Sequence, residues 1–369
     1  MNFEFSDDQV SLRDAVARWA EKGFSFERRH GLAKSGGATR AVWRELAELG
    51  LTGLAVEPDH GGMGFGPVEA MVVMEELGRG LVNAPYAQGA LIAPALLRTG
   101  SAAFQQDWLP GIASGEKLVV LAHQEHGARY RLDQVATRAV EGAAGWRLDG
   151  AKSVVPAGDE ADAFIVPAHS AHGIRLFMVK QEDAQVRGYP TQDGARAAEV
   201  VLRNAPAELI TVDGLVALER GVDIGIAAVC AEAVGLMDKL VAMTVEYLNT
   251  RKQFGVPIGS FQALRHRMAD VKMQLELGRS MSYFASLKLG EAAPQRRRAL
   301  SQAKVQLGQS MRFVGQQCIQ MHGGIGVTDE YAGSHYFKRL TMLEMAFGDT
   351  MHHLGEVSKR MQDTAGVFA

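Results

Sequence analysis

The hydrophobic pattern of this chain changes its period twice, and this constrains the fold more than any other feature. Apolar residues recur at helical spacing up to Glu116, and from Lys117 they alternate in short runs bounded by Gly, Pro, Asp and Asn. Near Val212 the helical spacing returns. The sequence therefore predicts an α-helical domain at residues 1–116, a β domain at 117–212 and a second helical domain at 213–369.

The first domain opens with a helix start signal. Ser6 and Gln9 have the spacing of a capping box, and Asp7 and Asp8 suit the positive end of a helix dipole. Gly and Pro separate the helical patterns that follow. We expect these helices over Arg40–Leu49, Pro67–Gly78, Ala87–Leu97 and Ala102–Ile112.

The middle domain reads as all β. Its short apolar runs are Leu118–Ala122, Trp146–Leu148, Ser153–Val155, Ala163–Val166, Ile174–Val179 and Glu199–Leu202. Turn-forming residues separate them at short intervals, which is typical of a small barrel or sandwich.

Two long apolar stripes mark the last domain. One stripe consists of Val229, Ala233, Leu236, Leu240, Met243 and Tyr247, and the other of Leu300, Ala303, Leu307, Met311, Val314, Cys318 and Met321. Long amphipathic helices with few breakers are typical of an antiparallel bundle. We expect a four-helix bundle made of Leu215–Asn249, Phe261–Leu289, Arg296–Met321 and Met345–Gln362.

Charge and composition exclude several classes of function. The 369 residues have a net charge of -3, with 47% hydrophobic and 22% charged residues, so no nucleic-acid partner is expected. No apolar run approaches the ~18 residues of a membrane span, and the acidic N-terminus lacks the apolar core of a signal peptide. Cys230 and Cys318 lie in helical apolar patterns, so we expect buried free thiols and a cytoplasmic location.

Two motifs near the C-terminal helices carry chemistry. The segment Arg251–Gly255 reads Arg-Lys-Gln-Phe-Gly and places a cation and an aromatic ring at the end of a long helix. The segment Gln320–Gly326 reads Gln-Met-His-Gly-Gly-Ile-Gly, a turn where backbone can approach a ligand closely. A guanidinium together with exposed backbone N–H groups is what a diphosphate requires.

In this order the two motifs resemble the C-terminal signature of the acyl-CoA dehydrogenase family. The segment from Glu57 to Gly64, the run from Trp108 to Lys117 and the hairpin from Trp146 to Lys152 are also similar to that family. The resemblance implies the acyl-CoA dehydrogenase fold, FAD as cofactor and an acyl-CoA substrate. In the family, matching residues of one subunit hold the ADP half of the FAD bound mainly by its neighbour. Here they are Arg251, Phe254, Gln262, Gln320, Gly323 and Gly324.

The catalytic carboxylate of the family is missing at both of its known positions. The reaction removes an α-proton, for which a Glu before a Gly-Thr serves as base in most members. Phe347 stands at that position, and Gly225 stands at the alternative position used by a minority. The flavin-lining segment His123–Arg129 and Pro156, which has no N–H to donate, also depart from the family pattern.

The chain keeps the residues that match the family's ADP-binding half but lacks those of the base and the flavin pocket. This difference favours a subunit of a heteromeric enzyme, similar to the small subunits of the pimeloyl-CoA dehydrogenase type. Such a chain contributes the ADP-binding half, and a second acyl-CoA dehydrogenase subunit contributes the base and the flavin pocket. The resemblance implies a dimer or tetramer, with an electron-transfer flavoprotein as the electron acceptor.

Two other functions remain open. The first is a self-sufficient flavoenzyme similar to nitroalkane oxidase, with Asp349 as the base. The second is a non-catalytic relative that binds CoA esters or proteins. We expect Asp349 to cap a helix or to pair with Arg339 or Lys338, and Glu344 to be a surface charge. No metal site is expected, because adjacent histidines such as His352 and His353 point ~100° apart on a helix.

Overall fold

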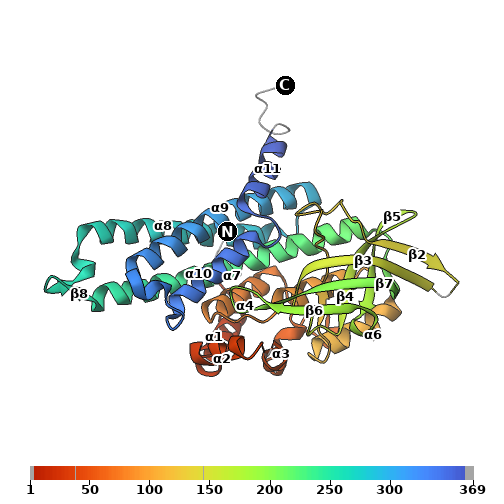
Figure 1. The fold of residues 1–369 in the computed structure, drawn as a ribbon, viewed down its shortest axis with the longest axis horizontal. Coiled ribbons are helices and arrows are strands. Elements are labelled where there is room, and N and C mark those ends of the chain that lie inside the picture. Colours follow the sequence, from red (N-terminus) through yellow and green to blue (C-terminus); the bar gives the residue numbers. More distant parts are fainter. Residues whose placement is uncertain (1–3, 38, 144, 362–369) are drawn as a thin grey trace. The chain divides into compact units, whose positions relative to one another are not determined.

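The structure, a computed structural model, describes residues 4–37, 39–143 and 145–361. Its elements form two units, each assembled from separate stretches of the chain (Figure 1). The helical unit contains Met1–Arg29, Pro67–Val82 and Ile226–Ala369, and the sheet unit contains His30–Gly66 and Asn83–Gly225. Helices from both ends of the sequence therefore share the core of the helical unit.

The N-terminal helices of the helical unit are α1 (Asp7–Gly23) and α4 (Pro67–Arg79), which pack against each other. The predicted capping box is present, since Ser6 Oγ accepts from the Gln9 N–H at 3.2 Å and Gln9 Oε1 accepts from the Ser6 N–H at 3.0 Å. Gly78 of α4 allows a close helix crossing, because a Cβ there would lie 2.2 Å from the Glu232 carbonyl oxygen. Small residues at this crossing bring the two backbones together.

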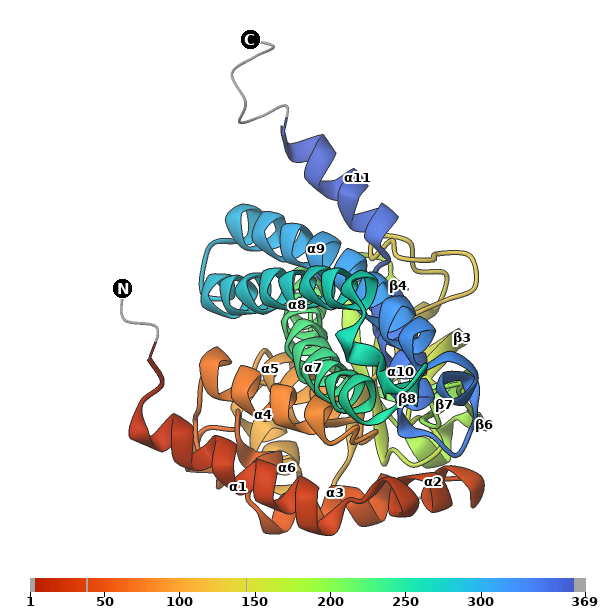
Figure 2. The ribbon, with the colours of Figure 1, turned by 90° about the vertical axis from the view of Figure 1, so that its left-hand side faces the viewer.

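The C-terminal region is helical, as predicted. It contains α7 (Gly214–Thr250), α8 (Gln262–Lys288), α9 (Ala293–His322), α10 (Ala332–Met345) and α11 (Thr350–Met361). Helix α7 belongs to the helical unit from Ile226 onward. The stripe from Leu300 to Met321 is buried throughout, and in the other stripe Met243 and Tyr247 are only half-buried. Helices α8, α10 and α11 all contact α9 (Figure 2).

The expected helix Met345–Gln362 is wrong at its start. The chain forms α10 up to Met345, leaves the helix and begins α11 at Thr350, and Gln362 lies outside the described residues. Phe347 and Gly348 have φ values of 58° and 115°, which no α-helix contains. The sequence pattern also missed α10, which precedes the expected helix.

The sheet unit contains a seven-stranded sheet. Its strands are β1 (Val119–Leu121), β2 (Arg138–Gly142), β3 (Gly145–Pro156), β4 (Ala163–Ser170), β5 (Gly173–Lys180), β6 (Gln185–Pro190) and β7 (Arg196–Thr211). They pair in the order β1-β4-β2-β3-β7-β5, with β6 on β7, and a further β4–β5 pairing closes a ring. The sequence predicted a barrel or a sandwich, and this closed strand pairing is that of a small barrel.

Sequence patterns found the buried strands and missed the exposed ones. Trp146–Leu148 and Ser153–Val155, expected as two strands, belong to the single strand β3, which contains register shifts near Asp149 and Val154. Strands β2 and β6 were not predicted because most of their side chains face solvent and give no apolar alternation.

The remaining predicted helices of the N-terminal region match the structure closely. They are α3 (Thr39–Glu48), a π-helical turn Ala87–Ile92 that continues into α5 (Ala93–Leu97), and α6 (Ala102–Ala113). Helix α2 (Phe26–Lys34) was not predicted. Within the described ranges, none of the helices has the length and apolar character that a bilayer crossing requires.

Candidate functional site

The six residues predicted to bind the ADP half of FAD lie at one end of the helical unit. Helix α7 ends at Thr250 and is followed by a hairpin of β8 (Lys252–Gln253) and β9 (Val256–Pro257), visible at the tip in Figure 1. Helix α9 runs antiparallel to α8 and so ends near the start of α8. The rings of Tyr247 and His322, 4.6 Å apart between centroids, join the ends of α7 and α9.

The hairpin presents a cation and an aromatic ring to solvent. The Arg251 N–H donates to the Tyr247 carbonyl at 2.9 Å, which fixes the backbone while the side chain stays exposed. Phe254 is 92% exposed and adopts a left-handed φ of 52°, which costs a non-glycine residue about 1 kcal/mol. Its ring meets Phe261 edge-on at 6.2 Å. An ordered but exposed ring of this kind is typical of a contact surface.

The glycine-rich motif forms an open turn, the 3-10 helix Gly323–Val327. Gly323 has φ 63° and ψ -141°, a conformation that side chains disfavour, and its N–H caps α9 by donating to the Gln320 carbonyl. A Cβ on Gly323 or Gly324 would meet no atom within 4 Å. The turn therefore leaves room for another group beside the exposed side chains of Gln262 and Gln320.

The buried side chain of His322 packs next to this turn and makes a hydrogen bond with Tyr331, which the sequence did not predict. His322, 2% exposed, donates from Nδ1 to the Cys318 carbonyl at 2.8 Å, so its Nε2 accepts from the Tyr331 hydroxyl at 2.7 Å. Burial lowers the pKa of His322 and raises that of Tyr331 to about 12. The nine-residue spacing between the two side chains matches no helix or strand period, so no sequence signal indicated the pair.

Phe347, predicted from the sequence to occupy the first family base position, lies in a turn whose backbone carbonyls accept hydrogen bonds from buried side chains. Lys304, 0% exposed, donates from Nζ to the carbonyls of Leu343, Glu344 and Gly348 at 3.0, 2.7 and 2.8 Å. His353 contacts the Phe347 carbonyl through Nε2 at 3.1 Å. Burial and nearby Lys304 lower the pKa of His353 to about 3, so this ring stays neutral.

The Phe347 side chain itself is half-buried and carries no titratable group. Gly348 beside it is required by packing, since a Cβ there would lie 2.6 Å from Nε2 of His353. The turn therefore has a defined geometry, and the side chain of Phe347 offers no proton acceptor.

Asp349 and Glu344 both act at the start of α11. Asp349 Oδ1 accepts from the His352 N–H at 2.7 Å, which is an N-cap contact and supports the expected capping role. Arg339, one expected partner of Asp349, pairs with Glu232 at 2.6 Å. Glu344 is not the expected surface charge, because its side chain is only 13% exposed and accepts from the Thr350 N–H and hydroxyl.

Gly225, predicted from the sequence to occupy the second family base position, is buried inside α7. Asp223 is also buried, at 1% exposure, and was missed because it falls within an apolar run. Two residues along a helix point ~200° apart, so Asp223 faces away from the side that residue 225 would occupy. Neither position in α7 supplies a carboxylate there.

The segment His123–Arg129 of the sheet unit, which departs from the family pattern, is held by a buried ion pair. Glu125, within His123–Arg129, accepts from Lys152 Nζ at 2.6 Å and from the Thr137 hydroxyl at 2.6 Å. Lys152 is fully buried and also donates to the Pro167 carbonyl. Burial and the nearby Lys152 lower the pKa of His123 to about 4. Pro156 ends β3, paired with Ala197. The buried Lys152–Glu125 ion pair therefore stabilises the fold of the sheet unit. Pro156 itself has no N–H to donate.

Comparisons with known proteins identify the family. Residues 6–116 match the model described as the acyl-CoA dehydrogenase N-terminal domain, and residues 213–362 match that of the C-terminal domain. The chain is 30% identical to the acyl-CoA dehydrogenase IpdE2 of Mycolicibacterium smegmatis, with 90% of this chain and 92% of that protein covered. The chain belongs to the acyl-CoA dehydrogenase family.

Two solved structures show the same fold. The structure superposes on a variant of the Tcur3481-Tcur3483 steroid ACAD with a TM-score of 0.89 at 27% identity, covering 98% of this chain and 99% of that one. It also superposes on the ChsE4-ChsE5 complex from Mycobacterium tuberculosis with a TM-score of 0.89 at 26% identity, covering 99% and 100%. The acyl-CoA dehydrogenase fold, with helical terminal regions and a middle sheet, is therefore confirmed.

The residues of this acyl-CoA dehydrogenase fit one half of FAD better than the other. An exposed guanidinium, an exposed ring and an open glycine turn at one end of the helical unit suit a diphosphate and an adenosine. In the sheet unit Pro156 has no N–H to donate, and in the helical unit the Phe347 side chain has no carboxylate.

Proposed function

We propose that this chain is a subunit of an FAD-dependent acyl-CoA dehydrogenase whose catalytic base lies on a partner subunit. The reaction class is α,β-desaturation of an acyl-CoA thioester, in which the α-carbon loses a proton and the β-carbon loses a hydride as the double bond forms. The observation that carries the proposal is the turn at residues 346–349. Lys304 and His353 hold its backbone, yet Phe347 stands where a carboxylate is needed.

Arg251, Phe254, Gln262, Gln320, Gly323 and Gly324 would hold the ADP half of FAD bound mainly by the partner. FAD, when bound, supplies the hydride acceptor. The chain's own contribution is binding and orientation. Arg251 offers charge-assisted hydrogen bonds to the diphosphate, and the turn at Gly323 allows backbone to approach the cofactor. The His322–Tyr331 hydrogen bond keeps that turn in place.

The partner we propose is a second acyl-CoA dehydrogenase subunit, as in enzymes of the pimeloyl-CoA dehydrogenase type. The ChsE4-ChsE5 structure supports this proposal, because it is a complex of two differently named chains and one of them shares this fold. A dimer or a dimer of dimers follows if the six residues that hold the ADP half of FAD must reach a second chain. We expect an electron-transfer flavoprotein to accept the electrons.

A self-sufficient enzyme with Asp349 as base is the second candidate. Asp349 is half-buried and lies two residues after Phe347, which favours the idea. Its Oδ1, however, already accepts the α11 cap hydrogen bond, and a base must direct a lone pair at the substrate. A non-catalytic relative that binds CoA esters or proteins is the third candidate, and the same experiment separates all three.

The test is flavin content followed by single-turnover flavin reduction with a panel of acyl-CoA thioesters. The chain is purified alone and after co-expression with candidate partner subunits, which are acyl-CoA dehydrogenases of the same organism that carry the base. The proposal expects little FAD and little reduction from the lone chain, because a positioned base contributes ~10²–10⁴-fold. With its partner the chain should bind FAD tightly and the flavin should be reduced rapidly.

Matched variants make the result specific. Asp349→Asn should leave the rate of the two-chain enzyme nearly unchanged, and Phe347→Glu should not make the lone chain active, since the residues facing the flavin ring still differ. Rapid reduction by the lone chain that Asp349→Asn abolishes would replace the proposal by the self-sufficient enzyme. No FAD bound by any combination would favour the non-catalytic relative.

A further inference from the structure

Helix α8 carries two sets of mostly apolar residues on opposite faces. Its inner face packs against α4 and α9 and consists of the buried residues Val271, Leu275, Gly278, Ser282 and Ala285. A second set has the same spacing of three and four residues and consists of Met273, Leu277, Ser280, Phe284 and Leu287. Residues two positions apart on a helix point ~200° apart, so the second set lies on the far side of α8 from the first. We call this second set the outer face of α8.

The outer face is exposed although four of its five residues are apolar. Met273, Leu277 and Leu287 are 53%, 44% and 52% exposed, and Phe284 is half-buried. A surface helix of a monomer has one apolar stripe, and a helix that is apolar on all sides is buried on all sides. Helix α8 therefore has one apolar stripe more than the helical unit covers. Its alternating three- and four-residue spacing is the one with which a second helix packs.

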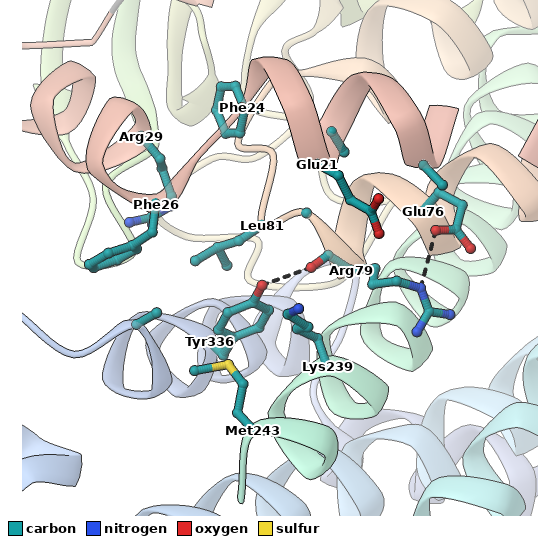
Figure 3. A pocket seen from close by; sticks show the side chains of 14 residues that line it. Glu21, Phe24, Phe26, Arg29, Glu76, Arg79, Leu81, Lys239, Met243 and Tyr336 are labelled. Atoms are coloured by element: carbon teal, nitrogen blue, oxygen red, sulfur yellow. Dashed lines mark hydrogen bonds and ion pairs between the residues drawn. The ribbon is translucent and has the colours of Figure 1, made fainter. Parts of the chain in front are cut away.

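A network of ion pairs fixes the orientation of α8. Arg279 pairs with Glu75 of α4 at 2.6 Å and with Asp238 of α7 at 3.1 Å. Arg79 of α4 pairs with Asp238 and with Glu76 in the same network, and Figure 3 shows the Arg79–Glu76 contact. Rotation of α8 about its axis would break these contacts, so the outer face cannot turn toward the core of the helical unit.

Helix α9 extends this surface with a row of residues that has few charges. The row has the same three- and four-residue spacing and consists of Gln302, Gln306, Gln309, Phe313 and Gln316. Gln306 donates to Gln274, the neighbour of Met273, at 3.3 Å, so the row lies beside the outer face of α8 (Figure 2). Between Ala299 and Met321 the charged residues are Lys304, which is fully buried, and Arg312. Depletion of charges is typical of the core of a protein interface.

Charged residues lie at the edges of this α8–α9 surface. Lys272 pairs with Glu276 at 2.7 Å on the side of α8 away from α9, and Arg298 lies one turn before the start of the α9 row. From Met273 to Leu287 the surface is about 21 Å long, and two helices side by side are about 20 Å wide. Side-chain relief raises the accessible area above this flat area of roughly 400 Å², toward the ~800 Å² that a standard interface buries on each partner.

The order of residues on the outer face fits a second copy of the same helix. Ser280 lies at its centre, with Met273 and Leu277 on one side and Phe284 and Leu287 on the other. A two-fold axis at Ser280 therefore brings the first pair of one copy against the second pair of the other copy, with the two helices antiparallel. The small serine side chain lets the helices approach closely at the axis.

We propose that two copies of this chain associate through the α8–α9 surface, with α8 antiparallel to α8 of the second copy and Ser280 at the two-fold axis. Ser280 follows Gln262 by 18 positions, so the axis lies about 27 Å along α8 from the residues proposed to hold FAD. One chain can therefore bind a second copy through α8 and a catalytic partner at the other end. The dimer does not depend on the proposed function, and the two proposals together predict an enzyme with two copies of each subunit.

Sedimentation velocity of the full chain, purified alone, tests the interface. The wild-type chain should be a dimer at about 10 µM, because interfaces of standard size have Kd values in the micromolar range or below. Leu277→Glu should weaken the dimer roughly 100-fold or more, since a symmetric dimer would bury two unpaired carboxylates. Met351→Glu is the matched control, because Met351 is 72% exposed on α11, and it should leave the dimer unchanged. Both substitutions lie at exposed positions, and the thermal midpoint checks that each variant folds.

A disulfide locates the two-fold axis. Cys230 and Cys318 are buried, so Ser280→Cys adds an accessible thiol that the wild-type chain lacks. Two cysteines can form a disulfide when their Cα atoms lie within about 7 Å, which residues at a two-fold axis satisfy. Mild oxidation should therefore link Ser280→Cys into covalent dimers. Ser358→Cys, at an exposed position of α11, should stay unlinked under the same conditions.

A wild-type chain that sediments as a monomer at that concentration would overturn the proposal, as would a dimer that Leu277→Glu leaves intact. Equal cross-linking of Ser280→Cys and Ser358→Cys would also overturn it.

The two-chain enzyme separates this proposal from the proposed function. Leu277→Glu should halve the mass of that assembly and leave its FAD content unchanged. If α8 binds the catalytic partner instead, the lone chain stays monomeric and Leu277→Glu removes FAD, and this result overturns the proposal. If no catalytic partner exists, the proposed function fails, but the lone chain still dimerises and Leu277→Glu still dissociates it.

Discussion

Replacing Lys304 by methionine should destabilise the helical unit and loosen the turn that carries Phe347. The Lys304 ammonium is fully buried and donates to three carbonyl oxygens, those of Leu343, Glu344 and Gly348. Methionine matches the length of the lysine stem but donates no hydrogen bond. Each carbonyl that loses its partner in a buried place costs about 1–3 kcal/mol.

The cost of burying the Lys304 charge acts in the opposite direction on the free energy of unfolding. Burial lowers the pKa of Lys304 to about 8, from ~10.4 in an unfolded chain. Removing this ammonium therefore returns roughly 3 kcal/mol of desolvation cost at pH 7. The three lost contacts outweigh it, so we expect a net loss of about 3 kcal/mol, or a fall in Tm of roughly 6–12 °C.

The pH dependence gives a second, sharper expectation. Between pH 8 and pH 10.4 the unfolded wild-type chain binds more protons at this lysine than the folded chain, so its stability rises with pH. Below pH 8 both states are protonated and the contribution is constant. Lys304→Met lacks this gain, so its deficit relative to wild type should widen by up to ~3 kcal/mol across that interval.

Differential scanning calorimetry of both proteins at pH 7 and pH 10, at one protein concentration, measures both effects. Lys22→Met, an exposed lysine of α1, is the matched control and should change the midpoint by less than about 2 °C. Equal midpoints for wild type and Lys304→Met at pH 7, with no widening at pH 10, would refute the role given to this lysine.

Three further substitutions test other parts of the structure. Arg251→Ala should weaken FAD binding by the two-chain enzyme roughly 10–100-fold without changing helix content, as measured by flavin fluorescence titration and circular dichroism. Lys152→Met should destabilise the sheet unit by about 3–5 kcal/mol in urea unfolding, because Glu125 would stay buried without its cation; a loss below about 1 kcal/mol would contradict this. Tyr331→Phe should cost about 1 kcal/mol and raise the pKa of His322 in NMR titration, since water can then reach Nε2, whereas an unchanged titration would argue against the hydrogen bond.

Sequence patterns predicted the elements whose side chains are buried on one face. The stripe from Leu300 to Met321 is long, regular and fully buried, so its period defines α9. Strands β2 and β6 lie at exposed positions, and their pairing depends on partners elsewhere in the chain. The break between α10 and α11 was missed because left-handed φ at Phe347 has no compositional signal.

The candidate site also contains parts that the sequence predicted and parts that it did not. The Arg251 hairpin and the glycine turn were placed by local motifs, and the structure brings both to one end of the helical unit through the Tyr247–His322 contact. The contacts that hold the site could not be predicted, because they join residues far apart in sequence. Lys304 reaches carbonyls about forty positions away, and nothing around it distinguishes it from a surface lysine.

Lys304 and His353 hold the turn at residue 347 through its main chain, and this has a consequence for substitutions in the turn. Lys304 and His353 contact carbonyl oxygens, which every amino acid possesses. Replacement of Phe347 by another unbranched side chain should therefore leave these contacts in place, whereas proline and β-branched residues do not fit its left-handed φ. If a partner subunit supplies the base, as we propose, the side chain at this position can change without loss of these contacts.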